Sequence, residues 1–251
     1  MHAHYYEGQD LEALATLPAY QEWILEKFRP YLRGKVVEIG AGLGNITSRY
    51  ADGVEELLLV EPAENLEGML RERFESRPHV RVLCALVDDV APAAHGVPFD
   101  SALMVNVLEH VGDDASMLSS IRAILRPRGR LLLFVPACPW LYGTLDEKVG
   151  HARRYTLKGL ERVVQDAGFA VETIRYFDLL GVLPWFLMGR VRRIREFSPR
   201  SARLYDRLGV PIAKAIEKYF KPPLGKNLLC IARVEEAGPA QVGVAGNGST
   251  R

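Results

Sequence analysis

The run from Val36 to Asn45 constrains the fold of this chain more than any other stretch. It reads Val-Val-Glu-Ile-Gly-Ala-Gly-Leu-Gly-Asn, a largely apolar segment with three glycines at alternate positions. A continuous apolar run is typical of a strand buried on both faces of a parallel sheet. Glycine adopts backbone conformations that other residues avoid, and it lets a ligand approach the main chain closely. The run therefore predicts a buried strand that turns sharply at a ligand-binding edge.

Six further apolar runs follow, and helical patterns separate most of them. The expected strands span 36–39, 57–60, 80–86, 101–105, 131–135, 169–176 and 228–234. We expect short helices to begin at Asn45 and Asp113, and another to be capped by Thr156 and stopped at Gly168. This alternation predicts an α/β fold: a Rossmann-like, doubly wound and mostly parallel seven-stranded sheet that binds ligands at the carboxyl ends of its strands.

The pattern divides the chain into four regions. Residues 1–35 are expected to form an N-terminal helical lid, and 36–177 together with 227–235 form the core. A helical insertion, 178–226, precedes the last strand. The tail, 236–251, is small and polar and is expected to be disordered.

The insertion combines basic and apolar side chains. Its residues 190–221 carry ten arginines and lysines against three acids, although the whole chain has a net charge of only +1. The apolar segment 185–188 lies beside them. A solvated helical face, a membrane surface and a lid over an anionic acceptor are three interpretations, of which basic and aromatic residues together favour contact with anionic lipid. The balanced total charge gives no case for nucleic acid.

The glycine turn departs from the dinucleotide-binding fingerprint. Its third glycine comes one residue early, and Asn45 stands where the nicotinamide pattern requires glycine. The pattern Glu-x-Gly-x-Gly-x-Gly over 38–44 resembles motif I of class I methyltransferases that use S-adenosylmethionine, and the match extends to Glu61 after the second strand. The cofactor contacts that this resemblance implies are Glu38, Gly40, Gly42, Gly44, Asn45, Glu61, Pro62, Leu86 and Asn106.

The resemblance also implies roles for these residues. Glu38 would lie near the amino group of the methionine moiety, and Glu61 would accept bonds from both ribose hydroxyls, as a carboxylate can. Leu86 stands where relatives often carry an acid and would pack on the adenine. The alternative is that Glu61 only caps the next helix and that the glycines only form a tight turn.

The segment after the fourth strand is a candidate reaction site. Residues 106–111, Asn-Val-Leu-Glu-His-Val, resemble the Leu-Glu-His signature of small-molecule methyltransferases. Some relatives bind a divalent metal through Glu-x-x-Glu-His, but Asn106 replaces the first glutamate here, so no metal is expected. Glu109 and His110 either serve the reaction, with His110 as a catalytic residue, or cap the helix that follows.

The loop after the fifth strand carries the other candidates. Its His-x-Arg-Arg-Tyr run, 151–155, resembles that of a type 11/12-like bacterial subgroup often associated with glycosyltransferases and with lipid or polysaccharide assembly. His151 is the first choice of general base, because a neutral imidazole accepts a proton near pH 7. The candidate acceptor contacts are Trp140, Tyr142, Arg153, Arg154 and Tyr155. Alternatively, His151 orders the turn, the arginines pair with Asp146 and Glu147, and the aromatic residues are core.

Together these features predict methyl transfer from S-adenosylmethionine, leaving S-adenosylhomocysteine, to a small-molecule, lipid-linked or glycosylated acceptor. Oxygen is favoured because a histidine base is available, while nitrogen or carbon acceptors and a non-catalytic scaffold remain alternatives. Three dispersed cysteines, Cys84, Cys138 and Cys230, and the lack of a signal-peptide pattern predict a cytoplasmic protein with peripheral membrane contact. The sequence does not indicate the oligomeric state.

Overall fold

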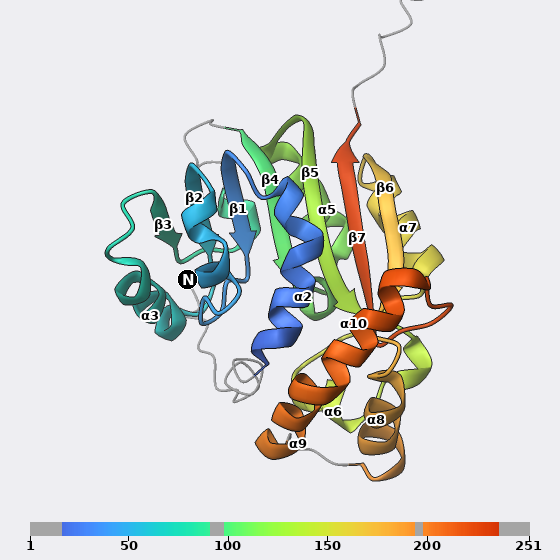
Figure 1. The fold of residues 1–251 in the computed structure, drawn as a ribbon. Helices are drawn as coiled ribbons and strands as arrows, with labels where there is room; N and C mark the ends of the chain where they lie inside the picture. Colours follow the sequence, from blue (N-terminus) through green and yellow to red (C-terminus); the bar gives the residue numbers. More distant parts are fainter. Residues whose placement is uncertain (1–16, 91–97, 194–197, 236–251) are drawn as a thin grey trace, which may run out of the picture.

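A seven-stranded sheet forms the centre of the computed structural model, which describes residues 17–90, 98–193 and 198–235 (Figure 1). Its strands are β1 (Lys35–Ile39), β2 (Glu56–Val60), β3 (Val80–Leu83), β4 (Phe99–Val105), β5 (Leu125–Pro136), β6 (Phe169–Phe177) and β7 (Asn227–Val234). Their order across the sheet is β3-β2-β1-β4-β5-β7-β6. The seven predicted strands are confirmed, although β3 ends three residues early and β5 begins six residues early.

The sheet is mostly parallel, as predicted. Strands β1 to β5 pair in parallel, and β7 runs antiparallel to both of its neighbours, β5 and β6. The carboxyl ends of β1, β2, β3, β4 and β5 therefore lie along one edge. All the loops that carry predicted site residues begin at that edge, where parallel α/β sheets bind their ligands.

Helices cover both faces of the sheet (Figure 1). Alternate residues of β5 divide between two cores: Leu131 and Leu133 belong to one, Leu132 and Phe134 to the other. The first core includes α5 (Asp114–Ile124) and α7 (Leu157–Asp166), and the second includes α2 (Pro18–Phe28), α3 (Glu64–Phe74) and α10 (Val210–Tyr219). This alternation is the two-residue period of a strand buried on both sides.

Two helix starts follow the predicted caps. The Asp113 carboxylate accepts a bond from the amide of Ser116 at the start of α5, and the Thr156 hydroxyl accepts one from the amide of Gly159 at the start of α7. Each bond satisfies an amide that has no partner within its helix. Gly168, at a φ of +82°, ends α7 as predicted.

The prediction of a helix beginning at Asn45 is wrong. Two 3₁₀ turns, Thr47–Arg49 and Ala51–Gly53, take its place. The Asn45 side chain caps no helix, because its oxygen accepts a bond from Nη1 of Arg73 at 2.9 Å. Gly44 immediately before it has a φ of +71° and still belongs to the glycine turn.

The described part of the predicted lid is a layer of the core. In α2, the Trp23 ring packs on Phe177 of β6 with centroids 3.9 Å apart, and both side chains are fully buried. Residues 1–16 lie outside the described part of the chain. The helix at 18–28 therefore covers the sheet.

The predicted helical insertion lies between β6 and β7. It contains α8 (Val182–Phe186), a π-helical turn (Leu187–Val191), α9 (Pro199–Leu204), a second π-helical turn (Tyr205–Gly209) and α10. In the described part of the chain, no helix has both the length and the apolar character needed to cross a membrane.

Candidate functional site

The glycine turn after β1 is held in conformations that favour glycine. Gly40, Gly42 and Gly44 have φ values of +70°, +55° and +71°. A Cβ atom on Gly40 would lie 2.5 Å from a methyl of Val107, and one on Gly44 would lie 2.7 Å from the Phe74 ring. The turn therefore needs glycine at these positions, both for its backbone angles and for its packing.

The Glu61 carboxylate is fixed against this turn. It accepts bonds from the amide of Gly42 at 2.9 Å and from the amide of Ala63 at 3.1 Å, each through a different oxygen. Burial raises the pKa of Glu61, and these two amide bonds oppose the rise. Because a carboxylate has about four lone-pair positions, two remain for a ligand's hydroxyl groups.

Glu38 is buried at the end of β1 beneath the turn. Its Oε2 accepts bonds from the hydroxyls of Thr47 and Tyr50, both at 2.7 Å. Burial raises the pKa of Glu38 to about 7, against the lowering effect of the two bonds. A cationic group placed beside it would favour the ionised carboxylate.

The other predicted cofactor residues follow β1, β2, β3 and β4 and differ in depth. Asn106, directly after β4, has a φ of +55°, and its backbone N–H donates to the carbonyl of Phe134. Pro62 is half-buried beside Glu61, and Asn45 is half-buried beside Gly44. Leu86 is about half exposed, as an apolar surface for a flat ring would be.

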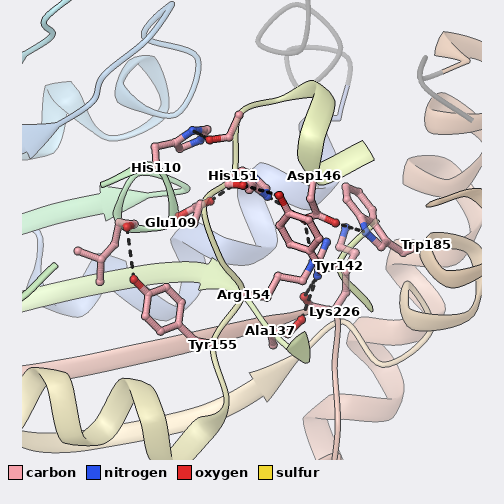
Figure 2. Close-up of polar contacts among 12 residues, drawn as sticks. Glu109, His110, Ala137, Tyr142, Asp146, His151, Arg154, Tyr155, Trp185 and Lys226 are labelled. Carbon is pink, nitrogen blue, oxygen red and sulfur yellow. Dashed lines mark hydrogen bonds and ion pairs between the residues drawn. The ribbon is translucent and has the colours of Figure 1, made fainter. Parts of the chain in front are cut away.

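The second part of the site joins the loops after β4 and β5. The 3₁₀ turn Leu108–His110 carries Glu109 and His110, and the amide of Ala152 donates to the carbonyl of Glu109 at 2.8 Å. The His110 and His151 rings consequently meet edge to face, with centroids 4.9 Å apart (Figure 2). The structure thus brings both predicted catalytic histidines together, although 40 residues separate them in the chain.

His151 is oriented by a buried carboxylate. Its Nδ1 lies 2.8 Å from Oδ1 of Asp146, and its Nε2 lies 3.6 Å from Oε1 of Glu109. Burial alone would raise the pKa of Asp146, but its bonds to His151 and Arg154 outweigh burial and hold that pKa below its usual range. An ionised Asp146 favours the tautomer with a proton on Nδ1, which leaves the Nε2 lone pair facing Glu109.

Arg154 supports this carboxylate from below. Its Nε donates to Oδ1 of Asp146 at 2.8 Å, and its Nη1 donates to the carbonyl of Ala137 at 2.9 Å. The guanidinium also lies 4.9 Å from the centre of the Trp185 ring. Figure 2 shows Arg154, Trp185 and Asp146 gathered together next to His151.

The predicted acceptor contacts lie at different depths in the site. Arg154 and Tyr155 are buried, and the Tyr155 hydroxyl donates to Asp114, so both residues build the floor of the site. Arg153 pairs with the same Asp114 at 2.9 Å. Tyr142 donates to the carbonyl of His151, whereas Trp140 is about half exposed and open to a ligand.

Glu109 differs from every carboxylate around it. It is fully buried, and neither oxygen has a hydrogen-bond partner among the described residues. Burial raises its pKa to about 8, although the backbone of Glu109 itself and, to a smaller extent, the Arg154 charge oppose the rise. Glu109, His110 and His151 each offer a ligand atom, and these atoms lie within 4.8 Å of one another, so this group could hold a metal ion.

Sequence reasoning missed the residues that join the two halves of the site. Asp114 binds both Arg153 and Tyr155, and Trp185 of the insertion donates to Asp146 at 3.4 Å. No local pattern marks either residue, because each is adjacent to its partner only through the fold. The alternative interpretation paired both arginines with Asp146 and Glu147; Arg154 bonds to Asp146, whereas Arg153 pairs with Asp114.

Comparisons with known proteins agree with this geometry. Residues 8–174 match a family model described as a methyltransferase domain. A 37.1 kDa protein in transposon TN4556 of Streptomyces fradiae is 29% identical over 182 residues, which cover 65% of this chain and 52% of that protein. A Mycobacterium bovis protein named as a methyltransferase is 25% identical, over 54% of this chain and 51% of its own length. The matches thus span about half the length of these relatives.

One solved structure with the same fold holds a ligand. The N-methyltransferase NodS from Bradyrhizobium japonicum, in complex with S-adenosyl-L-homocysteine, has a TM-score of 0.56 and 14% identity. The alignment covers 87% of this chain and 89% of NodS. At this identity the likeness establishes the fold alone.

We predict that the two neighbouring arginines differ in their effect on stability. Arg154→Met leaves the buried Asp146 carboxylate without its guanidinium partner, so we expect a loss of about 3–5 kcal/mol in the free energy of unfolding. Arg153→Met, the matched control, removes an ion pair whose arginine is one-third exposed, and it should cost about 1 kcal/mol. Urea denaturation measures both, and equal losses would contradict the supporting role of Arg154.

Proposed function

The chain belongs to the methyltransferase domain family, and from this premise we propose that it transfers the methyl group of S-adenosylmethionine to an oxygen atom of a small-molecule or lipid-linked acceptor. The observation that carries the donor assignment is the Glu61 carboxylate, fixed by Gly42 and Ala63 at the glycine turn. Nitrogen and carbon acceptors, and a cofactor-binding scaffold, are the alternatives that the experiments below separate.

The residues present fit this cofactor. Glu61 keeps lone pairs for the two donors of a ribose diol, and the buried Glu38 gains from a cationic amino group. The glycine turn leaves no Cβ atoms at Gly40 and Gly44, where packing excludes them. S-adenosylmethionine supplies a methyl group on a positively charged sulfur, which is lost to a nucleophile on the opposite side.

An oxygen acceptor fits the polar cluster at the carboxyl ends of β4 and β5. A hydroxyl must lose its proton as it is methylated, and we assign the promotion of that step to His151 and His110. Asp146 orients the His151 ring so that Nε2, rather than Nδ1, faces the cluster. General base catalysis of this kind contributes roughly 10²–10⁴-fold.

The surface of the insertion supports an acceptor that is attached to lipid. Twelve large apolar side chains are exposed in the described part of the chain, and nine of them lie in the insertion. Leu204, Leu208, Ile212 and Ile216 follow each other at steps of four along the helix formed by α9, the π-helical turn and α10. In an α-helix a step of four residues is slightly more than one turn, so successive side chains rotate around the axis. The π-helical turn has more residues per turn and rotates them back, so the four side chains form one stripe.

The charges of this helix are divided between its two faces. Asp206 is buried and accepts bonds from the amides of Ala19 and Tyr20 at the start of α2, while the buried Glu217 accepts one from the amide of Leu179. The basic residues on the outer side are exposed: Arg200, Arg203, Arg207 and Lys218. An apolar stripe among exposed basic residues fits an anionic bilayer surface, which we propose as the partner of this face.

We predict that Glu61→Ala abolishes most cofactor binding. Loss of charge-assisted bonds worth about 1.5–3 kcal/mol should raise the Kd of S-adenosylmethionine and S-adenosylhomocysteine at least tenfold in calorimetry. Glu64→Ala, an exposed acid three residues later, is the control and should bind as the parent does. If the Glu61 variant binds S-adenosylmethionine as tightly as the parent does, or if the parent binds NAD instead, the donor assignment is wrong.

We predict that His151→Ala lowers kcat without weakening cofactor binding. The assay incubates the protein with methyl-labelled cofactor and a metabolite and lipid extract, then identifies the labelled product and its methylated atom. We expect an O-methyl product and a fall of roughly 10²–10⁴-fold in kcat with that acceptor. His79→Gln, remote from the cluster, is the control. Full activity of the His151 variant would refute its role, and no turnover across broad extracts would favour the scaffold.

We predict that the outer face of the insertion binds anionic vesicles. At low salt the protein should co-sediment with phosphatidylglycerol-containing vesicles more than with neutral ones, and salt should weaken the binding. The double variant Leu208→Glu/Ile212→Glu should reduce binding at least about tenfold, because each apolar side chain contributes about 1.5–3 kcal/mol when buried. Met69→Glu, an equally exposed apolar site on α3, is the control. Equal binding to neutral and anionic vesicles would contradict the proposal.

A further inference from the structure

Glu109, His110 and His151 form a cluster with the composition of a catalytic metal site. Two loops supply them: the 3₁₀ turn after β4 carries the first two residues, and the loop after β5 carries His151. Their ligand atoms lie within 4.8 Å of one another, and Figure 2 shows His110 and His151 close to Glu109 at the carboxyl edge of the sheet. The group therefore brings one carboxylate and two imidazoles to a single point.

Glu109 is the first sign that something is bound there. Its side chain is fully buried and both oxygens lack a hydrogen-bond partner among the described residues, although a buried carboxylate without partners is costly. The nearest cationic candidate is Nε2 of His151, at 3.6 Å, which is beyond hydrogen-bonding distance. A cation between these groups would satisfy the carboxylate.

The arrangement around the two imidazoles is the second sign. Histidines that bind metals nearly always donate the N–H of their other ring nitrogen to a carboxylate or a backbone carbonyl. Nδ1 of His151 lies 2.8 Å from Asp146, and Nδ1 of His110 lies 3.2 Å from the carbonyl of Gly150. Each ring thus has an outer partner of the kind that directs a metal-binding lone pair.

We propose that Glu109, His110 and His151 bind one divalent transition-metal ion through a carboxylate oxygen and two imidazole nitrogens. Imidazole ligands suit Zn²⁺, Fe²⁺ and Co²⁺ better than Mg²⁺ or Ca²⁺, which prefer oxygen. Three protein ligands leave a coordination position open, as in catalytic zinc sites. Because metal–ligand bonds are about 2.0–2.2 Å, the ligand atoms must close by about an ångström, and the exposed His110 ring can move to do so.

Metal binding is argued from the cluster itself. The role of the ion toward an acceptor hydroxyl rests on the proposed function. A hydroxyl bound at the open position would lose its proton to water more readily, since a metal lowers the pKa of a bound hydroxyl. The resulting oxygen lone pair forms the bond to the methyl carbon as the carbon–sulfur bond breaks and its electron pair stays on sulfur. His110 and His151 then promote proton loss as ligands of the ion.

The sequence argued against a metal because Asn106 replaces the first acid of the Glu-x-x-Glu-His pattern. The structure places His151, which lies 45 positions after Asn106 in the chain, beside Glu109 and His110. The third ligand therefore comes from another loop, and the substitution at Asn106 changes the donor set from hard oxygen ligands to mixed nitrogen and oxygen ligands.

The test measures metal binding directly on the full chain. After treatment with a chelator and its removal, the protein is titrated with Co²⁺, followed by visible absorption, and then with Zn²⁺ in competition. We expect one ion per chain, with at least tenfold weaker binding in both Glu109→Gln and His151→Gln, and unchanged binding in the control His79→Gln. Thermal unfolding shows whether each variant is folded, and the bound ion should raise the Tm of the parent and of the control alone.

Three results would overturn the proposal: no binding of Co²⁺ or Zn²⁺ by the folded parent, parent-like affinity in either cluster variant, or full methyl transfer in the presence of chelator. The third result would leave the proposed function intact, with direct proton transfer to His151 in place of the ion. Failure of the proposed function itself appears elsewhere, as absence of cofactor binding in calorimetry. The two proposals are therefore distinguishable.

Discussion

The architecture of the site depends on one buried carboxylate, Asp146. It accepts bonds from Arg154, from the amide of Gly143 and from Trp185, and it fixes the Nδ1 side of His151. These partners come from the end of the β5 loop, its beginning and the insertion. Arg154 is charged and His151 can be, while the Gly143 amide and Trp185 are neutral donors. These bonds keep the Asp146 carboxylate ionised although it is buried. Without it, Nδ1 of His151 would lose its partner and Arg154 would lose its ion pair.

The fold followed from patterns that are local in the sequence. The apolar runs and the caps Asp113 and Thr156 act over a few residues, so periodicity and hydrogen-bonding capacity were enough to place them. The glycine turn was equally local, because positive φ angles are a property of single residues. Asn45 failed as a cap because Arg73, distant in sequence, takes its side-chain oxygen. A propensity argument has no access to that competitor.

The site was only partly predictable for the same reason. His110 and His151 were chosen for their chemistry, but their edge-to-face contact depends on the bond between Ala152 and Glu109, which joins two loops. Arg154 and Arg153 look alike in the sequence, yet one is buried against Asp146 and the other lies at the surface beside Asp114. The buried arginine is the one that supports the site. Its burial depends on how the loop after β5 packs under the insertion.

The division of charge on the insertion helix has a consequence for how such a protein can diverge. Asp206 and Glu217 serve the interior, where they complete backbone hydrogen bonding at α2 and beside β6. Exposed bases such as Arg203 and Arg207 belong to the opposite face. Descendants could therefore exchange the outward residues freely and be directed to a different surface, while the inward acids hold the same scaffold in place.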